Sequence, residues 1–212
     1  MEIDINALTP LDQYKLLSST IVPRPIALVT TRSLDGRDNA APFSFFNCMG
    51  ENPPVLVLSL ETRRSDGSLK DTTINIRDTG EFVVHLVDED LGEAMNVCAI
   101  DFPNDMDEAT QAGLTLVPSA RVRAQRIVEA PVAFECEKIC LLQISPGRHI
   151  AIAKVLLMHV RDGLIEREKL YVDIKQYKPI GRLFAGLYTR TRDQFEMRVP
   201  DYAEWARVRE LR

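Results

Sequence analysis

Short apolar segments joined by tight turns run through most of this chain, and they limit the fold more than any other feature. About seven segments have the β-branched or alternating composition of strands, whereas the helical patterns are few and short. Consecutive strand patterns meet at turns such as Leu34–Arg37 and Ser145–Arg148. We therefore predict a mainly β fold, an antiparallel β-barrel with peripheral helices.

The first half of the chain predicts strands at Ile26–Thr31, Asn39–Phe46 and Val55–Leu60. Prolines force extended backbone just before two of these strands, in Val22–Pro25 and in Asn52–Pro54. The first two strands are predicted to pair as a hairpin, because an Asp-Gly turn separates them.

A helix start follows the third strand. Ser68 fits an N-cap, Asp71 follows three residues later as in a capping box, and Gly80 fits the C-terminal stop. Arg63 and Arg64 lie before this helix, in the loop that follows the third strand.

Positive charge gathers in this loop, although the whole chain has 26 Lys+Arg against 31 Asp+Glu. Arg63, Arg64 and Lys70 lie close to the N–H groups of the helix's first turn. Those N–H groups and the helix dipole favour an anion, and nearby cations add to the attraction. The pattern suits a phosphate monoester at residues 68–72; the alternative is a solvated basic loop with no ligand.

The second half predicts further strands and helices in a less regular order. Strands are predicted at Phe82–Val87, Ala120–Arg126, Pro131–Ile144 and His149–Val160, and helices at Asp88–Ala99 and Asp201–Arg212. Alternation in the 131–144 strand places Glu135 and Glu137 on an exposed face. The 149–160 strand is apolar on both faces, so we expect it to be buried.

The usual signatures of acid–base, nucleophilic and metal chemistry are missing from the sequence. There is no G-x-G-x-x-G, Walker loop or G-x-S-x-G elbow. His85, His149 and His159 lie in separate strand patterns without metal-ligand spacing, so we predict no metal site. The catalytic residues stay unknown, and a bound cofactor would have to supply any reaction.

The aromatic run Pro42–Asn47 has two interpretations. Its phenylalanines are core residues by default, as His85 is a structural histidine by default. Ser44 and Asn47 favour a second interpretation, because polar groups beside an aromatic pocket can fix a flat heterocycle by hydrogen bonds.

A net charge of −5 argues against nucleic acid as a partner, because nucleic-acid binding needs a basic face. No apolar run is long enough for a membrane helix, and the acidic N-terminus lacks a signal-peptide core. We therefore expect a cytoplasmic protein that binds neither nucleic acid nor membrane.

Five segments, in this order and spacing, resemble the flavin reductase-like, FMN-binding split-barrel family: VPRPIALVTT, DGRDNAAPFSFFN, ENPPVLVLSL, RRSDGSLKDTTINI and GEFVVHLV. PVAFECE, GRHIAIAKV and KPIGRLFAGLYTR are similar to later parts of the same family. The resemblance implies a leading segment at 1–19, a flavin reductase-like split-barrel domain at 20–190 and a C-terminal tail with a helix at 191–212.

The resemblance further implies a homodimer that holds FMN near the subunit interface. The flavin ring would lie along Thr30, Thr31 and 44–47, the phosphate would meet residues 63–72, and Arg24 and Tyr188 would close the pocket. The FMN-binding residues that follow are Arg24, Thr30, Thr31, Ser44, Phe45, Phe46, Asn47, Arg63, Arg64, Lys70, Asp71, Thr72 and Tyr188.

The activity implied is that of an NAD(P)H-dependent flavin reductase, in which the nicotinamide passes a hydride to N5 of FMN. The reduced flavin would then go to oxygen, a partner oxygenase or another electron acceptor. One alternative is a non-enzymatic FMN-binding electron carrier or flavin store. Another is a barrel without flavin that serves as a dimeric binding module. Three residues depart from the family pattern: His85 replaces an asparagine, and Phe184 and Ala185 stand where glycines are more usual. The bulk of Phe184 and Ala185 would narrow the nicotinamide side of the flavin.

Overall fold

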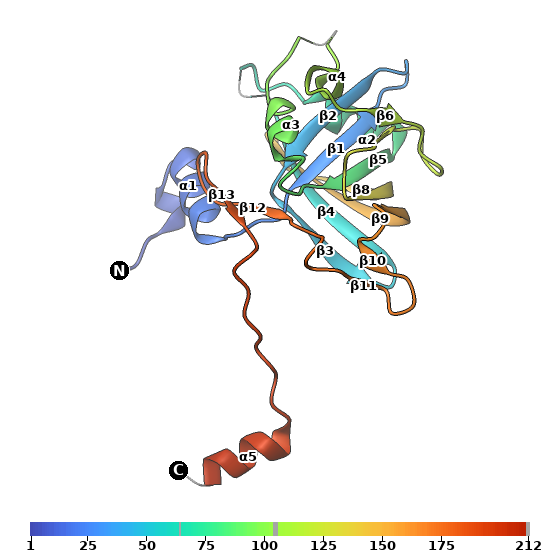
Figure 1. The fold of residues 1–212 in the computed structure, drawn as a ribbon. Coiled ribbons are helices and arrows are strands. Elements are labelled where there is room, and N and C mark those ends of the chain that lie inside the picture. The colour runs from blue at the N-terminus through green and yellow to red at the C-terminus, as the bar shows by residue number, and fades with distance from the viewer. Residues whose placement is uncertain (64, 104–105, 211–212) are drawn as a thin grey trace.

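The computed structural model describes residues 1–63, 65–103 and 106–210. Seven strands form its main sheet: β1 (Ala27–Arg32), β2 (Asp38–Phe43), β3 (Phe46–Glu51), β4 (Pro54–Glu61), β5 (Glu81–Leu86), β8 (Val132–Ser145) and β9 (Arg148–Val160). They are ordered β2-β1-β5-β8-β9-β4-β3, and each neighbouring pair is antiparallel (Figure 1). The predicted antiparallel, mainly β fold is confirmed.

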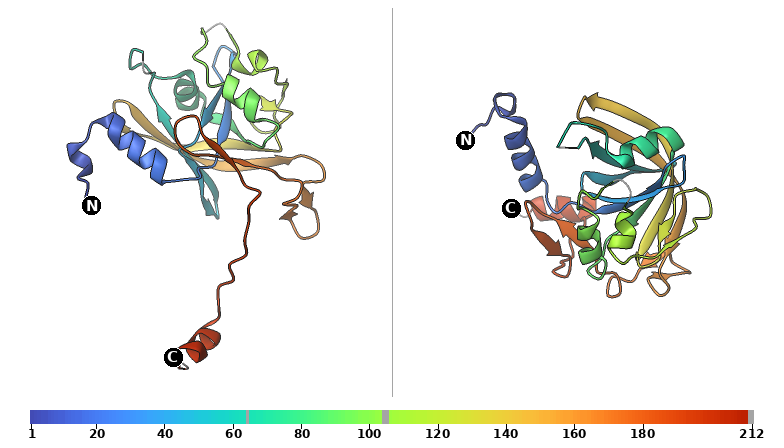
Figure 2. Two further views of the ribbon diagram at one scale, coloured as in Figure 1. Left: turned by 60° about the vertical axis from the view of Figure 1, so that its left-hand side comes forward. Right: turned by 90° about the horizontal axis from the view of Figure 1, so that it is seen from above.

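The sheet closes on itself through its two edge strands. β2 and β3 lie at opposite edges, yet only Ser44 and Phe45 separate them in the chain. The sheet must therefore curl until its edges meet, as the view from above shows (Figure 2). The Ser59 N–H donates to the Phe45 carbonyl at 2.9 Å, which ties this corner to β4. We call the residues Ser44 and Phe45 the seam.

Short helices and two-stranded ribbons surround the barrel. The helices are α1 (Pro10–Thr20), α2 (Asp71–Thr79), α3 (Gly92–Val97), α4 (Glu108–Gln111) and α5 (Tyr202–Glu210), preceded by a 3-10 turn at Ile5–Ala7. The ribbons pair β6 (Leu116–Val117) with β7 (Arg126–Ile127), β10 (Ile165–Glu166) with β11 (Tyr171–Val172), and β12 (Ile180–Arg182) with β13 (Tyr188–Arg190).

Alternating side chains of β1 face two separate hydrophobic cores, and a smaller third cluster contains Val83, Val122, Ala124 and Ala133. Ala27 and Val29 of β1 point into the barrel, where they meet Ile76 of α2, whereas Ile26 and Leu28 point outward. The outer core also contains Met95 of α3, the residues Leu91 and Cys98 that flank this helix, and Ala109 of α4. Helix α2 therefore covers the barrel's interior, and α3 and α4 cover the outside of β1 and β2.

Three local predictions were wrong. The 39–46 strand is interrupted at the seam, because the chain crosses there from one sheet edge to the other. The helix predicted at 88–99 contains only α3, because Asp88 instead accepts the Leu91 N–H and pairs with Arg161 at 3.0 Å. The 149–160 strand, which we expected to be buried on both faces, is not buried in this way along its second half, because Leu156 and Met158 are exposed there.

Glu135 is the largest departure from the predicted pattern. Its side chain is fully buried, although we expected it on an exposed face. The carboxylate accepts the N–H groups of Ala120 and Arg121, at 2.8 and 2.5 Å, and meets His159 Nε2 at 2.5 Å. These contacts lower the pKa of Glu135 against the effect of burial. The strand predicted at 120–126 was wrong. The N–H groups of Ala120 and Arg121 bond to this carboxylate instead of a neighbouring strand, and β7 begins only at Arg126.

His85 is a satisfied structural residue, as its default interpretation predicted. The ring is fully buried; Nδ1 lies 2.9 Å from the Leu28 carbonyl, and Nε2 accepts the Ile127 N–H at 2.9 Å. This geometry requires the neutral tautomer with the proton on Nδ1. Burial lowers the pKa of His85 to about 4.

The helices at the two chain ends lie outside the main sheet. Helix α1 stands beside the β12–β13 ribbon, and α5 projects on an extended segment well clear of every other element (Figures 1 and 2). Among the described residues, no helix is both long and apolar enough to cross a membrane.

Candidate functional site

A cavity of about 540 Å³ opens between α2, the seam, the residues after α3 and the β13 strand. Seven of the predicted FMN-binding residues line it: Ser44, Phe45, Arg63, Lys70, Asp71, Thr72 and Tyr188. The fold thus brings the predicted phosphate residues and part of the aromatic run into one space. Arg64 lies outside the described residues.

One end of the cavity is basic and lies at the start of α2. The helix begins at Asp71, and its N-cap residue, Lys70, makes no side-chain hydrogen bond to the first turn. Arg63 donates to Asp71 at 2.7 Å and to Asp101 at 2.9 Å. Lys70 Nζ lies 3.9 Å from Glu61. An uncapped helix start with cations beside it is a suitable place for an anion.

The N-cap prediction for Ser68 was wrong. The Ser68 N–H donates to Asp66 at 2.9 Å, and its carbonyl accepts the Arg63 N–H at 2.8 Å. Leu69 bridges to Thr62 in extended conformation, which delays the helix to Asp71. The end at Gly80, in a left-handed conformation, is confirmed.

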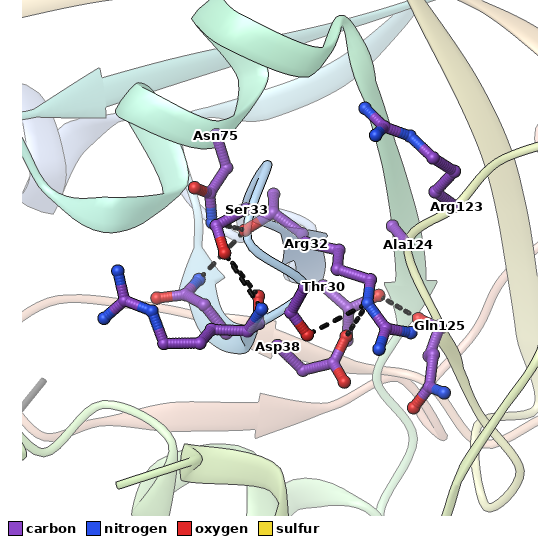
Figure 3. Close-up of polar contacts among 12 residues, drawn as sticks. Thr30, Arg32, Ser33, Asp38, Asn75, Arg123, Ala124 and Gln125 are labelled. Carbon is purple, nitrogen blue, oxygen red and sulfur yellow. Dashed lines mark hydrogen bonds and ion pairs between the residues drawn. The ribbon is translucent and has the colours of Figure 1, made fainter. Parts of the chain in front are cut away.

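Amides from β2 and α2 hold the hydroxyls beside the basic end. Asn39 Nδ2 donates to Thr72 Oγ1 at 3.0 Å, and Asn75 Nδ2 donates to Thr31 Oγ1 at 2.9 Å; Figure 3 shows Asn75 reaching down from the helix. Because Thr72 Oγ1 accepts here, its own proton remains available to donate toward the cavity. Thr31 lies behind this network and does not line the cavity.

Arg24 lies behind the seam and joins three segments. Its side chain is buried, donating from Nε to Ser44 Oγ at 3.3 Å and from Nη2 to the Leu183 carbonyl at 2.6 Å. Nη1 donates to the carbonyls of Ser18 and Ile21 at the end of α1. Burial lowers the pKa of Arg24. Arg24 therefore positions the walls of the cavity without lining it.

Cations and aromatic rings stack at the seam. The guanidinium carbons of Arg24 and Arg148 lie 5.6 and 5.8 Å from the centre of the Phe45 ring, and the Tyr14 ring lies 6.1 Å from it. Arg148 also lies 3.6 Å from Glu61, so it extends the basic end of the cavity. At the other end, Arg182 lies 4.4 Å from the centre of the Tyr188 ring.

Besides Arg24 and Thr31, three predicted residues do not line the cavity. Thr30 is buried and donates to the Gln125 carbonyl, as Figure 3 shows. Phe46 packs against the inner core. Asn47 is exposed, and its side chain accepts the Cys48 N–H at 2.8 Å.

Sequence reasoning missed several lining residues. Asn39, Glu61, Glu108 and Arg148 come from separate elements, and no local motif marks them. Glu108 accepts the Ala40 N–H at 3.0 Å, and burial raises its pKa. In the described ranges, no three His, Cys, Asp or Glu side chains are grouped so as to hold a metal ion.

Comparison with known proteins gives a consistent result. The family model "Flavin reductase like domain" matches residues 18–181. Two solved structures are similar over almost their whole length, each with a TM-score of 0.86. The 2-nitrobenzoate 2-nitroreductase of Pseudomonas fluorescens is 37% identical and covers 95% of this chain and 98% of its own. Component B of nitrilotriacetate monooxygenase from Bacillus cereus is 35% identical and covers 93% and 98%.

A third solved structure is similar in fold alone. It is a protein with a split-barrel domain from Shewanella frigidimarina, 18% identical with a TM-score of 0.79, covering 92% of this chain and 96% of its own. The closed antiparallel sheet described above is therefore a split barrel.

Proposed function

Because this chain belongs to the flavin reductase-like domain family, we propose that its cavity binds FMN and that the protein is an NAD(P)H-dependent flavin reductase. The observation that carries the proposal is the basic end of the cavity. There an uncapped helix start, the Thr72 hydroxyl and the side chains of Arg63 and Lys70 surround one space. A phosphate monoester satisfies these groups better than a neutral ligand does.

The residues along the cavity fit the rest of FMN as well. We place the phosphate at the start of α2 and the flavin ring along the seam, where Phe45 supplies an apolar surface and Ser44 a hydroxyl. The volume of about 540 Å³ lies in the range of cofactor sites. We take residues 20–190 as the flavin-binding domain.

The chain's own groups bind and orient, while the cofactor supplies the redox chemistry. When held in this cavity, FMN would supply the hydride and electron chemistry between the nicotinamide and oxygen, a partner oxygenase or another acceptor. Arg24 would hold the seam in place against this ring through its contacts with Ser44 and the Leu183 carbonyl. Cations near the cavity, including Arg148, would favour the anionic form of the reduced ring.

We further propose that the protein is a homodimer. Along the β8–β9 hairpin, five large apolar side chains are exposed: Ile139, Leu142, Ile144, Leu156 and Met158. An apolar surface of this kind commonly marks a subunit interface. In such a dimer, the proposed flavin site of each subunit would lie close to the partner subunit.

The first experiment is the visible spectrum of the purified protein mixed with FMN, followed by anaerobic addition of NADH and then NADPH. We expect a perturbed flavin spectrum that bleaches with at least one nicotinamide. A bound flavin that stays oxidised would favour the alternative, a non-enzymatic FMN carrier or store. Unperturbed flavin would refute both and leave a binding module.

The ion pair between Arg63 and Asp101 leads to a second prediction. A phosphate that binds Arg63 must compete with the Asp101 carboxylate, which occupies Nη1 at 2.9 Å. Asp101→Asn should therefore tighten FMN binding by about three- to fivefold, since an exposed ion pair is worth up to about 1 kcal/mol. Riboflavin, which lacks the phosphate, should bind equally to both proteins in a fluorescence titration.

The matched control for Asp101→Asn is Asp78→Asn. This residue is an acid at the far end of α2 and pairs with Arg77. The Asp78→Asn substitution removes the same charge from the chain, and Asp78 does not line the cavity. Equal tightening in both variants would mean that net charge, not competition at Arg63, sets the affinity.

A further inference from the structure

The C-terminal segment beyond the barrel is apolar, extended and without a covering surface. Residues 193–200, all within the described chain, form neither helix nor strand. Along them Phe195, Met197 and Val199 are 84%, 81% and 88% exposed. Polar residues alternate with these three, so the apolar side chains share one side of the extended segment. We call residues 193–207 the arm.

The arm leaves the barrel from a fixed root. Glu89, just before α3, pairs with Arg190 at 3.0 Å and with Arg192 at 2.5 Å. These contacts hold the chain up to residue 192 against the barrel, and the arm then runs outward (Figures 1 and 2). Eight extended residues reach roughly 26 Å, and α5 adds about 13 Å. The arm is therefore long enough to lie across a neighbouring molecule.

The helix at the end of the arm needs a surface to pack on. α5 has nine residues, and a helix of that length is marginal in water when isolated. Tyr202 is 80% exposed, and its ring lies 6.1 Å from that of Trp205. A short helix carrying two adjacent aromatic rings is typical of an element that becomes ordered by docking.

We propose that the arm docks on the barrel of a second copy of this chain, in a mutual exchange between two subunits. The proposal rests on the homodimer proposed above and not on the flavin chemistry. In a dimer with two-fold symmetry, each arm would dock on the other subunit through the same set of contacts. The receiving chain already carries exposed apolar side chains on β8, including Ile139 and Ile144.

The arm's apolar area is large enough to matter for a dimer. Phe195 and Tyr202 would each bury about 150–250 Å² if covered, and Trp205, which is 46% exposed, roughly half as much. Two arms therefore bury roughly 1,000 Å² from these aromatic rings alone, against about 1,600 Å² in a standard interface. A lipid surface suits the arm less well, because its acidic residues outnumber its basic ones and anionic headgroups would repel them.

The test changes the apolar side of the arm and leaves its polar side as the control. Phe195→Asp with Val199→Asp should raise the dimer dissociation constant by on the order of a hundredfold or more, measured by sedimentation. Glu196→Gln with Arg198→Gln, at the alternating positions, should leave it unchanged. Because these side chains are exposed, neither variant should alter the barrel's circular dichroism.

The single tryptophan supplies an independent readout. Trp205 lies in α5, and the chain has one Trp, so its emission reports the arm directly. We expect blue-shifted emission in the dimer and red-shifted emission in the double Asp variant. An unchanged dissociation constant would overturn the proposal, with blue emission then indicating docking on the same barrel. A blue shift only with phosphatidylserine vesicles would overturn it in favour of lipid.

Failure of the arm proposal remains distinguishable from failure of the flavin proposal. FMN is titrated into the same proteins under the same conditions. A dimer that binds FMN but is insensitive to the double Asp variant would refute the arm exchange alone. A dimer that depends on the arm but leaves the flavin spectrum unperturbed would refute the flavin site alone.

Discussion

Replacing Arg63 and Lys70 together by alanine is expected to weaken FMN binding by about a thousandfold. Each charge-assisted hydrogen bond to a phosphate contributes about 1.5–3 kcal/mol, so losing two costs about 4 kcal/mol. The loss of Arg63 also leaves Asp71 and Asp101 beside the phosphate without their partner, which adds repulsion. Fluorescence titration with FMN measures the effect.

Riboflavin and a distant arginine provide the controls for this double variant. Riboflavin lacks the phosphate, so its affinity should change by less than about threefold. Arg77→Ala removes a charge from the last turn of α2, where Arg77 pairs with Asp78, and should leave FMN binding unchanged. Equal losses for FMN and riboflavin would mean that the variant disrupts the cavity as a whole and that the phosphate lies elsewhere.

Acidification is expected to lower the free energy of unfolding by about 3 kcal/mol between pH 6.5 and pH 4 through His85 alone. The pKa of His85 in the folded state is about 4, below the ordinary value of 6.5. Between these two pH values, His85 is protonated in the unfolded chain and neutral in the folded chain. Stability therefore falls as the pH falls, by about 1.36 kcal/mol per unit of pKa difference. Below about pH 4 this contribution stays constant.

The physical reason is the double role of the His85 ring. Protonation of Nε2 would set its N–H against the Ile127 N–H, which it now accepts at 2.9 Å. Urea unfolding at several pH values, compared with His85→Asn, measures the effect. The variant should lose the slope between pH 4.5 and 6.5 while keeping the steeper loss at lower pH that the carboxylates produce. The same slope in both proteins would contradict this account.

Local sequence patterns were sufficient for the elements whose neighbours lie nearby in the chain. The apolar composition of residues 26–31 and 55–60 predicted β1 and β4, which the structure places at Ala27–Arg32 and Pro54–Glu61. Gly80 ended α2, as its left-handed conformation requires. The basic end of the cavity was predictable for the same reason, since Arg63, Lys70 and Thr72 lie within one loop and helix start.

The residues that sequence reasoning misplaced depend on register and on contacts across the sheet. Glu135 lies beside a register shift in the β8–β9 pairing, so strict alternation does not continue through it. Its burial becomes favourable only because two N–H groups from the 120–121 loop and His159 satisfy the carboxylate. Arg148 and Asn39 reach the cavity from distant strands, and no pattern of neighbouring residues specifies that arrangement.

The contacts of Arg24 bear on the order in which the protein is synthesised. All seven strands of the barrel precede residue 161, whereas the ribbon that accepts the Arg24 guanidinium at Leu183 comes later. On the ribosome, the N-terminal part of a chain generally folds first. The barrel would thus be complete while Arg24 still lacked its last partner. A nascent chain would complete the walls of its cavity as a late step, after the fold that supports them.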